Sequence, residues 1–268
     1  MSTDDKMHSI ISDLQKRDSV LVALSGGVDS SVLAALAYRA LGERAIAVTA
    51  DSQTFAPGEL ECAKEVAREI GIRHIVISYD ELGEPGFAKN PVDRCYHCKK
   101  GLIRELKKLA AIHGMETIVE GTNIQDLKNH RPGHRAVVEE GIYNPFVEFK
   151  VTKEEIREMA RKLDLSVADK PSMACLSSRF PYGQAITAEA LRRVGEAESY
   201  LKKAGFNVVR VRDHAGIARI EIMPSEMTRF LQMREDVVSE FKMLGFSYVT
   251  IDLMGFRSGS MDEIFANR

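Results

Sequence analysis

A glycine- and serine-rich segment is the strongest chemical signal in this sequence. It reads Ser25-Gly-Gly-Val-Asp-Ser-Ser31 and lies between a short apolar run and a stretch of helical periodicity. Two glycines allow a sharp turn and a close approach of the backbone to a ligand, and the start of the following helix favours an anion. An ordinary strand-to-helix turn with a serine cap is the alternative. The coincidence of a strand, an SGG turn and a DSS helix start favours a phosphate-binding loop, and the absence of GxxxxGK[ST] from the sequence excludes the Walker type.

Four cysteines are the second chemical signal, and two of them, Cys95 and Cys98, form a Cys-x-x-Cys pattern. The N-terminus lacks the features of a signal peptide, so we expect a cytoplasmic protein, in which clustered cysteines indicate a metal, a cluster or catalysis. Zinc bound by Cys95, Cys98 and Cys175 with His97 or Cys62, a redox pair, or a coincidence at a helix start all fit the spacing. Cys62 falls in a helical pattern, and we expect it to be structural.

Cys175 stands in a segment of polar and turn-forming residues, Pro171-Ser-Met-Ala-Cys-Leu-Ser-Ser-Arg-Phe-Pro-Tyr-Gly183. A lone cysteine beside Leu and Met can be a small buried hydrophobe. The two serines that follow Leu176, the arginine and the turn-forming residues of this segment favour a polar loop instead. In such a loop Arg179 helps to hold a thiolate.

The composition is that of a soluble globular protein, because 44% of the 268 residues are hydrophobic and 28% are charged. The net charge of −2 provides no overall basic field, so bulk binding of nucleic acid is not expected. The longest apolar stretches, such as residues 20–24 and 45–49, are too short to span a bilayer.

The elements that would position these residues alternate in the first half between buried strands and helices. This alternation predicts a parallel sheet with helices on both faces, and such sheets bind ligands at the carboxyl ends of their strands. The expected strands cover residues 19–24, 45–49, 74–78 and 116–120, and the expected helices cover residues 6–16, 30–41, 60–70 and 98–113.

The pattern changes after about Lys170, where a helix, two strands, further helical signals and a last strand indicate a small α+β unit. These elements are expected over residues 187–203, 206–212, 217–222, 224–244 and 248–253. The sequence therefore predicts an α/β fold with two domains, a parallel-sheet domain of residues 1–170 and a small α+β domain of residues 171–268 that includes the Cys175 loop.

The glycine turn resembles the SGGxDS loop of the PP-loop ATP pyrophosphatases, which include GMP synthetases, NAD synthetases and tRNA thiolation enzymes. In that family the loop holds the pyrophosphate that leaves while AMP passes to the substrate. The resemblance implies an adenine nucleotide alpha hydrolase-like fold and a bound ATP with Mg²⁺ near Asp29. It assigns ATP phosphates to Ser25, Gly26, Gly27, Asp29, Ser30 and Ser31, the adenine to Thr49, Ala50 and Asp51, and a further nucleotide contact to Gly121, Thr122 and Asn123.

Several later segments are similar to the LarE-type sulfur transferases of the nickel-pincer cofactor pathway, which serves lactate racemase. They are EGTNIQDLKNHRPG from Glu120, CLSSRFPYG from Cys175, VRVRDHAGIARIE from Val209 and YVTIDLMGFRSGSM from Tyr248. The resemblance implies a small-molecule substrate, a nicotinate-derived pyridinium mononucleotide whose two carboxylates are adenylated and become thiocarboxylates. It places Asp126, Arg179, Glu198, Arg210, Arg212 and Glu221 near the substrate or a bound metal.

These residues also have plainer interpretations. Guanidinium groups bind phosphate and carboxylate bidentately, yet Arg210 and Arg212 could equally form a charged strand face. Glu198, taken alone, fits a solvated helix residue. The family also implies a homo-oligomer, reportedly a hexamer.

The same resemblance implies a source of sulfur. One kind of family member sacrifices the sulfur of a cysteine at the position of Cys175. The other kind adds a Cys-x-x-Cys, and three cysteines bind a [4Fe–4S] cluster whose fourth iron carries sulfide from a sulfide or thiol donor. The presence of Cys95 and Cys98 fits the second kind, with Cys175 as the third ligand.

Two rival functions remain at this stage. A tRNA-thiolating enzyme shares the loop and a three-cysteine cluster, but the net charge of −2 speaks against an RNA-binding surface. A nucleotide-sensing module would bind ATP or AMP without turnover and would not need Cys175.

Overall fold

The computed structural model describes residues 1–128, 132–171, 173–257 and 259–261. The packing divides the chain into two compact units. The first unit comprises residues 1–52, 58–85 and 93–173, and the second comprises residues 53–57, 86–92 and the chain from Ala174 onward. The domain boundary expected between residues 170 and 171 stays a prediction.

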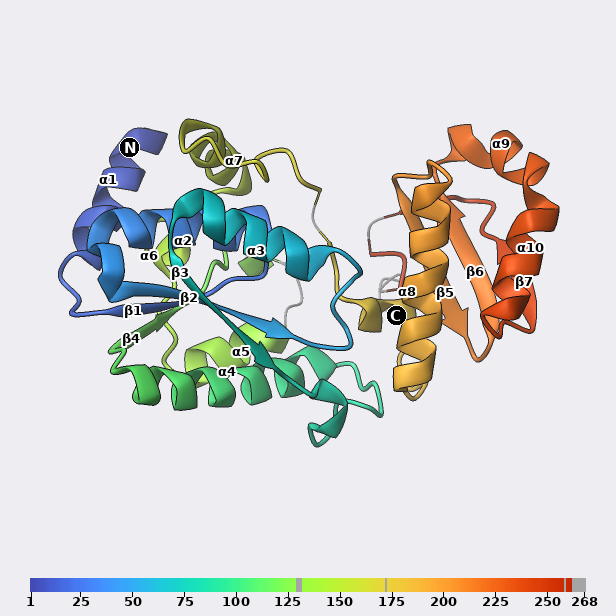
Figure 1. Ribbon diagram of the computed structural model, residues 1–268, viewed down its shortest axis with the longest axis horizontal. Helices are drawn as coiled ribbons and strands as arrows, with labels where there is room; N and C mark the ends of the chain where they lie inside the picture. Colours follow the sequence, from blue (N-terminus) through green and yellow to red (C-terminus); the bar gives the residue numbers. More distant parts are fainter. Residues whose placement is uncertain (129–131, 172, 258, 262–268) are drawn as a thin grey trace. The chain divides into compact units, whose positions relative to one another are not determined.

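The first unit is built on a four-stranded parallel sheet (Figure 1). Its strands, in spatial order, are β3 (Arg73–Ser78), β2 (Ala45–Asp51), β1 (Val20–Ala23) and β4 (Thr117–Val119). Successive residues of β1 face opposite sides, so Val20 and Val22 lie in one apolar cluster and Leu21 lies in another. The predicted α/β class with a parallel sheet is confirmed.

Helices cover both faces of this sheet, as the buried apolar residues of its central strands β1 and β2 require. One face packs against α1 (Thr3–Leu14), α2 (Val28–Leu41), α3 (Glu59–Ile70), the short α6 (Pro145–Glu148) and α7 (Lys153–Lys162). The other face packs against α4 (Arg94–His113), and α5 (Pro132–Glu139) packs on α4 (Figure 1). The described residues of this unit also form the 3-10 turns η1 (Gly42–Arg44), η2 (Glu81–Gly83) and η3 (Asp126–Lys128).

The ends of the helices follow local chemistry. Ser2 and Asp5 form a capping box at the start of α1, and Thr152 and Glu155 form another at the start of α7. Gly71 ends α3 in the left-handed conformation. The helix expected from residue 98 begins at Arg94 instead, which places both cysteines of the Cys-x-x-Cys pattern in its first turns.

The second unit contains a three-stranded sheet with the order β5 (Val209–His214), β6 (Ile217–Ile222), β7 (Tyr248–Ile251). The pairing of β5 with β6 is antiparallel, and that of β6 with β7 is parallel. Its helices are α8 (Ala188–Lys203), α9 (Met227–Gln232) and α10 (Arg234–Met243), with 3-10 turns η4 (Leu176–Arg179) and η5 (Pro224–Glu226). The predicted second, smaller α+β unit is confirmed.

Two short segments from the first half of the sequence belong to this second unit. The carbonyl of Thr54 accepts a hydrogen bond from the Leu176 N–H at 2.9 Å, and the carbonyl of Ala88 accepts one from Ile186 at 2.8 Å. The fully buried Asn90 donates its amide to the carbonyl of Pro181 at 2.7 Å. These hydrogen bonds connect residues 53–57 and 86–92 to the segment that follows Cys175.

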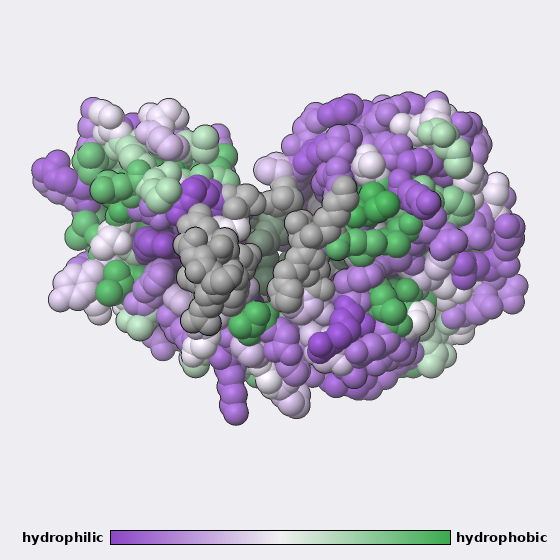
Figure 2. Space-filling model, turned by 180° about the vertical axis from the view of Figure 1, so that it is seen from behind, coloured by the Kyte–Doolittle hydropathy of each residue, from purple (hydrophilic) through white to green (hydrophobic). Residues whose placement is uncertain are grey.

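Polar side chains cover most of the face seen in Figure 2, and apolar side chains gather there only in small groups. Within the described ranges, no helix is both long and apolar enough to cross a membrane.

Replacement of Leu33 by alanine tests the core of the first unit. Leu33 is fully buried on α2, so Leu33→Ala should lower the free energy of unfolding by about 2–5 kcal/mol because it removes packed methyl groups and leaves a cavity. Ile112→Ala, at a side chain that is 76% exposed, is the control and should change it by less than about 0.5 kcal/mol. Urea unfolding measures both, and equal effects would contradict the assigned core.

Candidate functional site

The glycine turn lies between β1 and α2, at the carboxyl end of the sheet. Gly26 has a φ of +74°, which is favourable only for glycine, and a Cβ there would lie 3.0 Å from the backbone nitrogen of Ala63. Gly27 is the N-cap of α2 and has no side chain to satisfy the first N–H groups of that helix. Backbone donors at a helix start are therefore directed at this turn, as an anion site requires.

The serine hydroxyls hold this turn in shape. The Ser30 hydroxyl accepts a hydrogen bond from the Ser25 N–H at 3.1 Å and donates to the Gly27 carbonyl at 3.1 Å. The Ser31 hydroxyl donates to the same carbonyl at 2.8 Å. Ser30 and Ser31 are buried whereas Ser25 is exposed, so only Ser25 presents its side chain to solvent.

The loop after β4 packs directly on this turn. Because the strand order is β3-β2-β1-β4, the winding of the sheet reverses between β1 and β4, and ligands of open α/β sheets bind at such a point. A Cβ on Gly121 would lie 3.0 Å from the backbone nitrogen of Ser30. The structure thus brings together the two loops that were assigned to the nucleotide from the sequence.

Asp29, predicted to lie near Mg²⁺, already has two partners. Its carboxylate accepts a hydrogen bond from the buried Asn123 amide at 3.3 Å and forms an ion pair with Lys153. A carboxylate is a suitable magnesium ligand, and a cation at Asp29 would compete with the Lys153 ammonium. Asp126 turns its carboxylate onto the Asn123 N–H at 3.2 Å, so it shapes this loop.

Glu120 is a buried carboxylate at the end of β4. It accepts hydrogen bonds from the Lys99 ammonium at 2.9 Å, the Asn144 amide at 2.8 Å and the Thr122 hydroxyl. Burial alone would raise its pKa, but the charge of Lys99 and these hydrogen bonds outweigh it and lower the pKa to about 2. Thr122, predicted to contact the nucleotide, therefore also holds Glu120.

The residues predicted to hold the adenine end β2. The buried Thr49 hydroxyl donates to the Leu24 carbonyl at 2.7 Å and lies 2.8 Å from Nε2 of His74, so it connects the end of β1 to β2 and to the first residues of β3. Burial lowers the pKa of His74, which favours the neutral imidazole there. Ala50 is half-buried and Asp51 is exposed, and their contact with adenine stays a prediction.

The Cys-x-x-Cys pair opens α4 in the first unit. Cys95 is exposed and Cys98 is half-buried, and their separation of three residues places them on one face of the helix. None of the four cysteines forms a disulfide. Across the described residues, no group of three or more His, Cys, Asp or Glu side chains is arranged to hold a metal ion.

Cys175 lies in the second unit as the N-cap of η4, and its side chain is exposed. The interpretation of this cysteine as a buried hydrophobe is therefore wrong. Arg179 donates to the main-chain carbonyl of Cys175 at 3.2 Å and to that of Ala174 at 3.0 Å. Arg179 thus fixes the backbone that carries the cysteine.

Arg179 is fully buried, and such a charge must be paired. Its guanidinium makes two hydrogen bonds, of 2.8 and 2.9 Å, to the carboxylate of Glu198. Glu198 also accepts the Val211 N–H at 3.1 Å. Because Glu198 is 1% exposed, its interpretation as a solvated helix residue is wrong.

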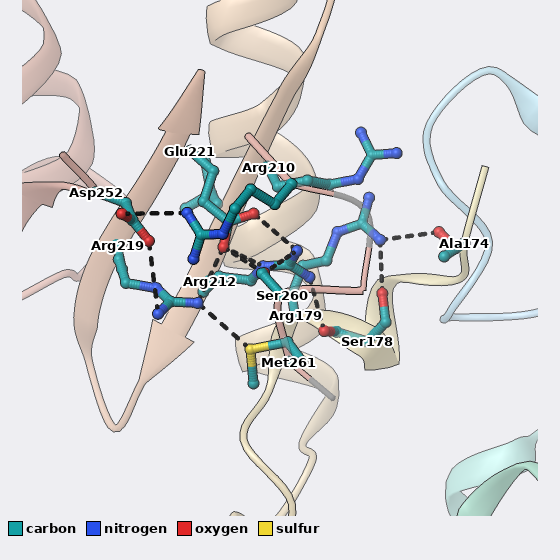
Figure 3. A network of polar contacts seen from close by, with 12 residues as sticks. Ala174, Ser178, Arg179, Arg210, Arg212, Arg219, Glu221, Asp252, Ser260 and Met261 are labelled. Atoms are coloured by element: carbon teal, nitrogen blue, oxygen red, sulfur yellow. Dashed lines mark hydrogen bonds and ion pairs between the residues drawn. The ribbon is translucent and has the colours of Figure 1, made fainter. Parts of the chain in front are cut away.

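A second buried ion pair joins β5 to β6 (Figure 3). Arg212 binds the carboxylate of Glu221 through two hydrogen bonds of 3.1 and 2.8 Å, and it donates to the Ser178 carbonyl at 2.9 Å. Ser260 and Arg219 also donate to Glu221, at 2.7 and 2.9 Å. The network connects the Cys175 segment to the sheet of the second unit.

Arg210 lies beside these pairs (Figure 3) and donates to the Val209 carbonyl at 2.7 Å. Burial, followed by the charges of Arg179 and Arg212, lowers the pKa of Arg210. Three guanidinium groups therefore lie close together at this point, and such groups are suitable partners for a phosphate or a carboxylate. The charged strand face proposed for Arg210 and Arg212 does not fit, because both are buried.

Four residues that shape the site in the first unit were not predicted from the sequence: Lys99, Asn123 as a partner of Asp29, Lys153 and Lys170. A capping box, Thr152 with Glu155, marks the helix that carries Lys153. This capping box was the sequence signal that could have revealed Lys153.

Comparison with known proteins bears on this site. The asparagine synthase family matches residues 8–87, which include the glycine turn. An uncharacterised protein of Synechocystis is 41% identical over 97% of this chain and 98% of its own length. The pyridinium-3,5-bisthiocarboxylic acid mononucleotide synthase of Lactiplantibacillus plantarum is 35% identical over 96% of this chain and 94% of its own length.

The chain belongs to the LarE family. A more distant relative is a glutamine-hydrolysing GMP synthase polypeptide of Archaeoglobus fulgidus, 28% identical over 73% of this chain and 65% of its own length. Membership of the LarE family makes this chain an ATP-using enzyme with a PP-loop domain.

Glu120→Gln should reveal the stabilising role of the buried carboxylate. The folded pKa of about 2 lies below the ordinary value of 4.5, so the charged form stabilises the fold fully above pH 4.5 and loses that effect as the pH falls toward 2. The wild type should therefore exceed the variant by about 3 kcal/mol at pH 6, and the difference should shrink toward pH 2. Unfolding by urea at each pH measures this, and a difference that does not change with pH would contradict it.

Gly121→Ala should disturb the nucleotide loop without unfolding the chain. The added methyl would press on the backbone of Asp29 and Ser30, so the start of α2 must shift. We expect ATP affinity, measured by calorimetry, to fall on the order of tenfold. Far-UV circular dichroism is the control for folding, and an affinity equal to that of the wild type would contradict the contact.

Proposed function

We propose that this protein uses ATP to activate the carboxylates of a nicotinate-derived pyridinium mononucleotide and converts them to thiocarboxylates. One observation supports this above the others: an SGG turn stands at the switch point of a parallel sheet, in a chain related over nearly its whole length to a synthase named for that product. The product would serve nickel-pincer cofactor synthesis, as in lactate racemase maturation.

The turn suits the first half of this reaction. A substrate carboxylate oxygen attacks the α-phosphorus of ATP, the bond to the β-phosphate oxygen breaks, and pyrophosphate leaves with that electron pair. Backbone donors at Gly27 and the start of α2 would hold the departing anion. Asp29 would help to hold Mg²⁺, which neutralises phosphate charge.

Sulfur enters in the second half. A carboxylate oxygen is a very poor leaving group, whereas AMP leaves readily, so a sulfur nucleophile can attack the acyl carbon and expel AMP. Cys175 is suited to this step because it is exposed and its backbone is fixed by Arg179. If Cys175 itself donates the sulfur, its Cβ–S bond breaks, the Cα proton is lost and dehydroalanine remains.

A [4Fe–4S] cluster is the sulfur carrier that we favour, because cysteine thiolates are the ligands that such a cluster takes. Its thiolate ligands would be Cys95, Cys98 and Cys175, none of which is in a disulfide. Three thiolates leave one iron for a non-protein ligand, so the group would supply sulfide from an external sulfide or thiol. Zinc is the alternative occupant of these cysteines.

The buried charges of the second unit suit the proposed substrate. Arg210 and Arg212 can recognise its phosphate and carboxylates, and Arg179, Glu198 and Glu221 fix their geometry. Asp126 would act from the nucleotide side. Assembly into a homo-oligomer, a hexamer by family resemblance, and a cytoplasmic location remain predictions.

The test supplies anaerobically purified protein with ATP, Mg²⁺, sulfide and the dicarboxylated pyridinium mononucleotide. Pyrophosphate, AMP and the thiocarboxylate are measured, and iron, acid-labile sulfide and zinc are quantified per chain. The wild type should release one pyrophosphate for each carboxylate converted. If no pyrophosphate is released, the proposed function is wrong.

Cys175→Ala separates the two halves of the reaction. The variant should still release pyrophosphate but form no thiocarboxylate, because activation does not need the thiol. Cys62→Ala is the matched control and should form thiocarboxylate normally. Sacrificial donation would leave a protein lighter by the mass of hydrogen sulfide after turnover, whereas the cluster route would leave the mass unchanged. Full thiocarboxylate formation by Cys175→Ala would contradict the assigned role.

A further inference from the structure

Lys170 contacts the glycine turn, and neither the sequence motifs nor the family resemblance gives it a role. Its ammonium donates to the Gly26 carbonyl at 3.0 Å and to the Glu59 carboxylate at 2.9 Å, and it lies 3.1 Å from the sulfur of Cys62. Its side chain is 19% exposed. The ammonium therefore joins the turn to the first turns of α3.

The cation is well supported at this position. Burial favours the neutral amine, but the hydrogen bonds to Cys62 and Glu59 outweigh it, and the pKa of Lys170 is raised. The backbone that carries it is also held, because Arg157 of α7 donates to the carbonyls of Ala168 at 2.6 Å and Lys170 at 2.9 Å. Both the ammonium and the main chain of Lys170 are therefore held in place by hydrogen bonds.

The contact between Lys170 and the Gly26 carbonyl fixes the orientation of the Gly26–Gly27 peptide group. In a trans peptide the C=O and the N–H point in opposite directions. The Gly26 carbonyl points to Lys170, so the Gly27 N–H points the other way, and it lies 3.4 Å from the Ser25 hydroxyl, inside the turn. A free left-handed glycine could rotate this peptide, and rotation would present a carbonyl oxygen to the anion.

We infer that Lys170 is a positioning residue for pyrophosphate: it fixes the Gly26–Gly27 peptide so that the Gly27 N–H faces the leaving group. This inference rests on the proposed function, in which the turn binds pyrophosphate. Lys170 acts through the peptide.

Cys62 shares the Gly26 carbonyl but is not the main support. Its thiol lies 3.6 Å from that oxygen, and S–H groups are weak donors. The two contributions can be separated, because Cys62→Ala leaves the ammonium in place whereas Lys170→Met keeps an unbranched side chain that is one heavy atom shorter and removes the charge.

Calorimetric titration of the full chain with magnesium pyrophosphate, and separately with AMP, tests the inference. Lys170→Met should weaken pyrophosphate binding on the order of tenfold and leave AMP affinity within about threefold of the wild type. Lys170→Arg, which restores a cation, should recover most of the loss. Cys62→Ala should bind pyrophosphate within about threefold of the wild type. Lys64→Met is the matched control, because Lys64 pairs with Glu61 on the exposed side of α3.

Pyrophosphate affinity unchanged in Lys170→Met would overturn the inference. So would equal losses of pyrophosphate and AMP binding, because a role in stability alone would weaken both. A wild type that binds pyrophosphate but shows no dependence on Lys170 would refute only this inference. A wild type that binds neither ligand would refute the proposed function and, with it, the role of Lys170.

Discussion

The conformation of the turn at Gly26 sets the orientation of the backbone donors in the first unit. Gly26 must adopt a positive φ and must also lie against Ala63, so both its conformation and its surroundings exclude a side chain. Gly121 is excluded from carrying one by its contact with the backbone of Asp29 and Ser30. The ends of β1 and β4 and the first turns of α2 and α3 are packed around this turn, and the backbone donors of the site have the orientation that this packing imposes.

The second unit depends on a different constraint, the burial of charge. Arg179 with Glu198 and Arg212 with Glu221 are paired through two hydrogen bonds each, as buried ions must be. These pairs connect the main chain of the Cys175 segment to β5, because Arg179 and Arg212 also donate to carbonyls of residues 174, 175 and 178. The position of the exposed thiol is thereby set by charges that solvent does not reach.

Much of the fold could be predicted from the sequence because its signals are local. Short runs rich in apolar residues predicted the strands of the parallel sheet, and the range expected for β6, residues 217–222, is the observed one. The elements between Gly121 and Lys170 were not predicted, although Thr152 and Glu155 form a recognisable capping box. The turn residues of the site were found because glycine has a distinctive conformational role. Lys99, Lys153 and Lys170 were not found, since an ordinary lysine acquires its role only from distant partners: Glu120, Asp29 and Gly26.

The assignment of residues 53–57 and 86–92 to the second unit has a consequence for how such a protein can be divided. The chain passes from one unit to the other after Ser52, Pro57, Pro85, Val92 and Met173. No single cut in the chain therefore yields both units intact, and a fragment that begins at Ala174 lacks the main-chain partners of Leu176 and Ile186. A gene exchange at any one of these junctions would divide at least one of the two units, so the interleaved path commits both units to being inherited together.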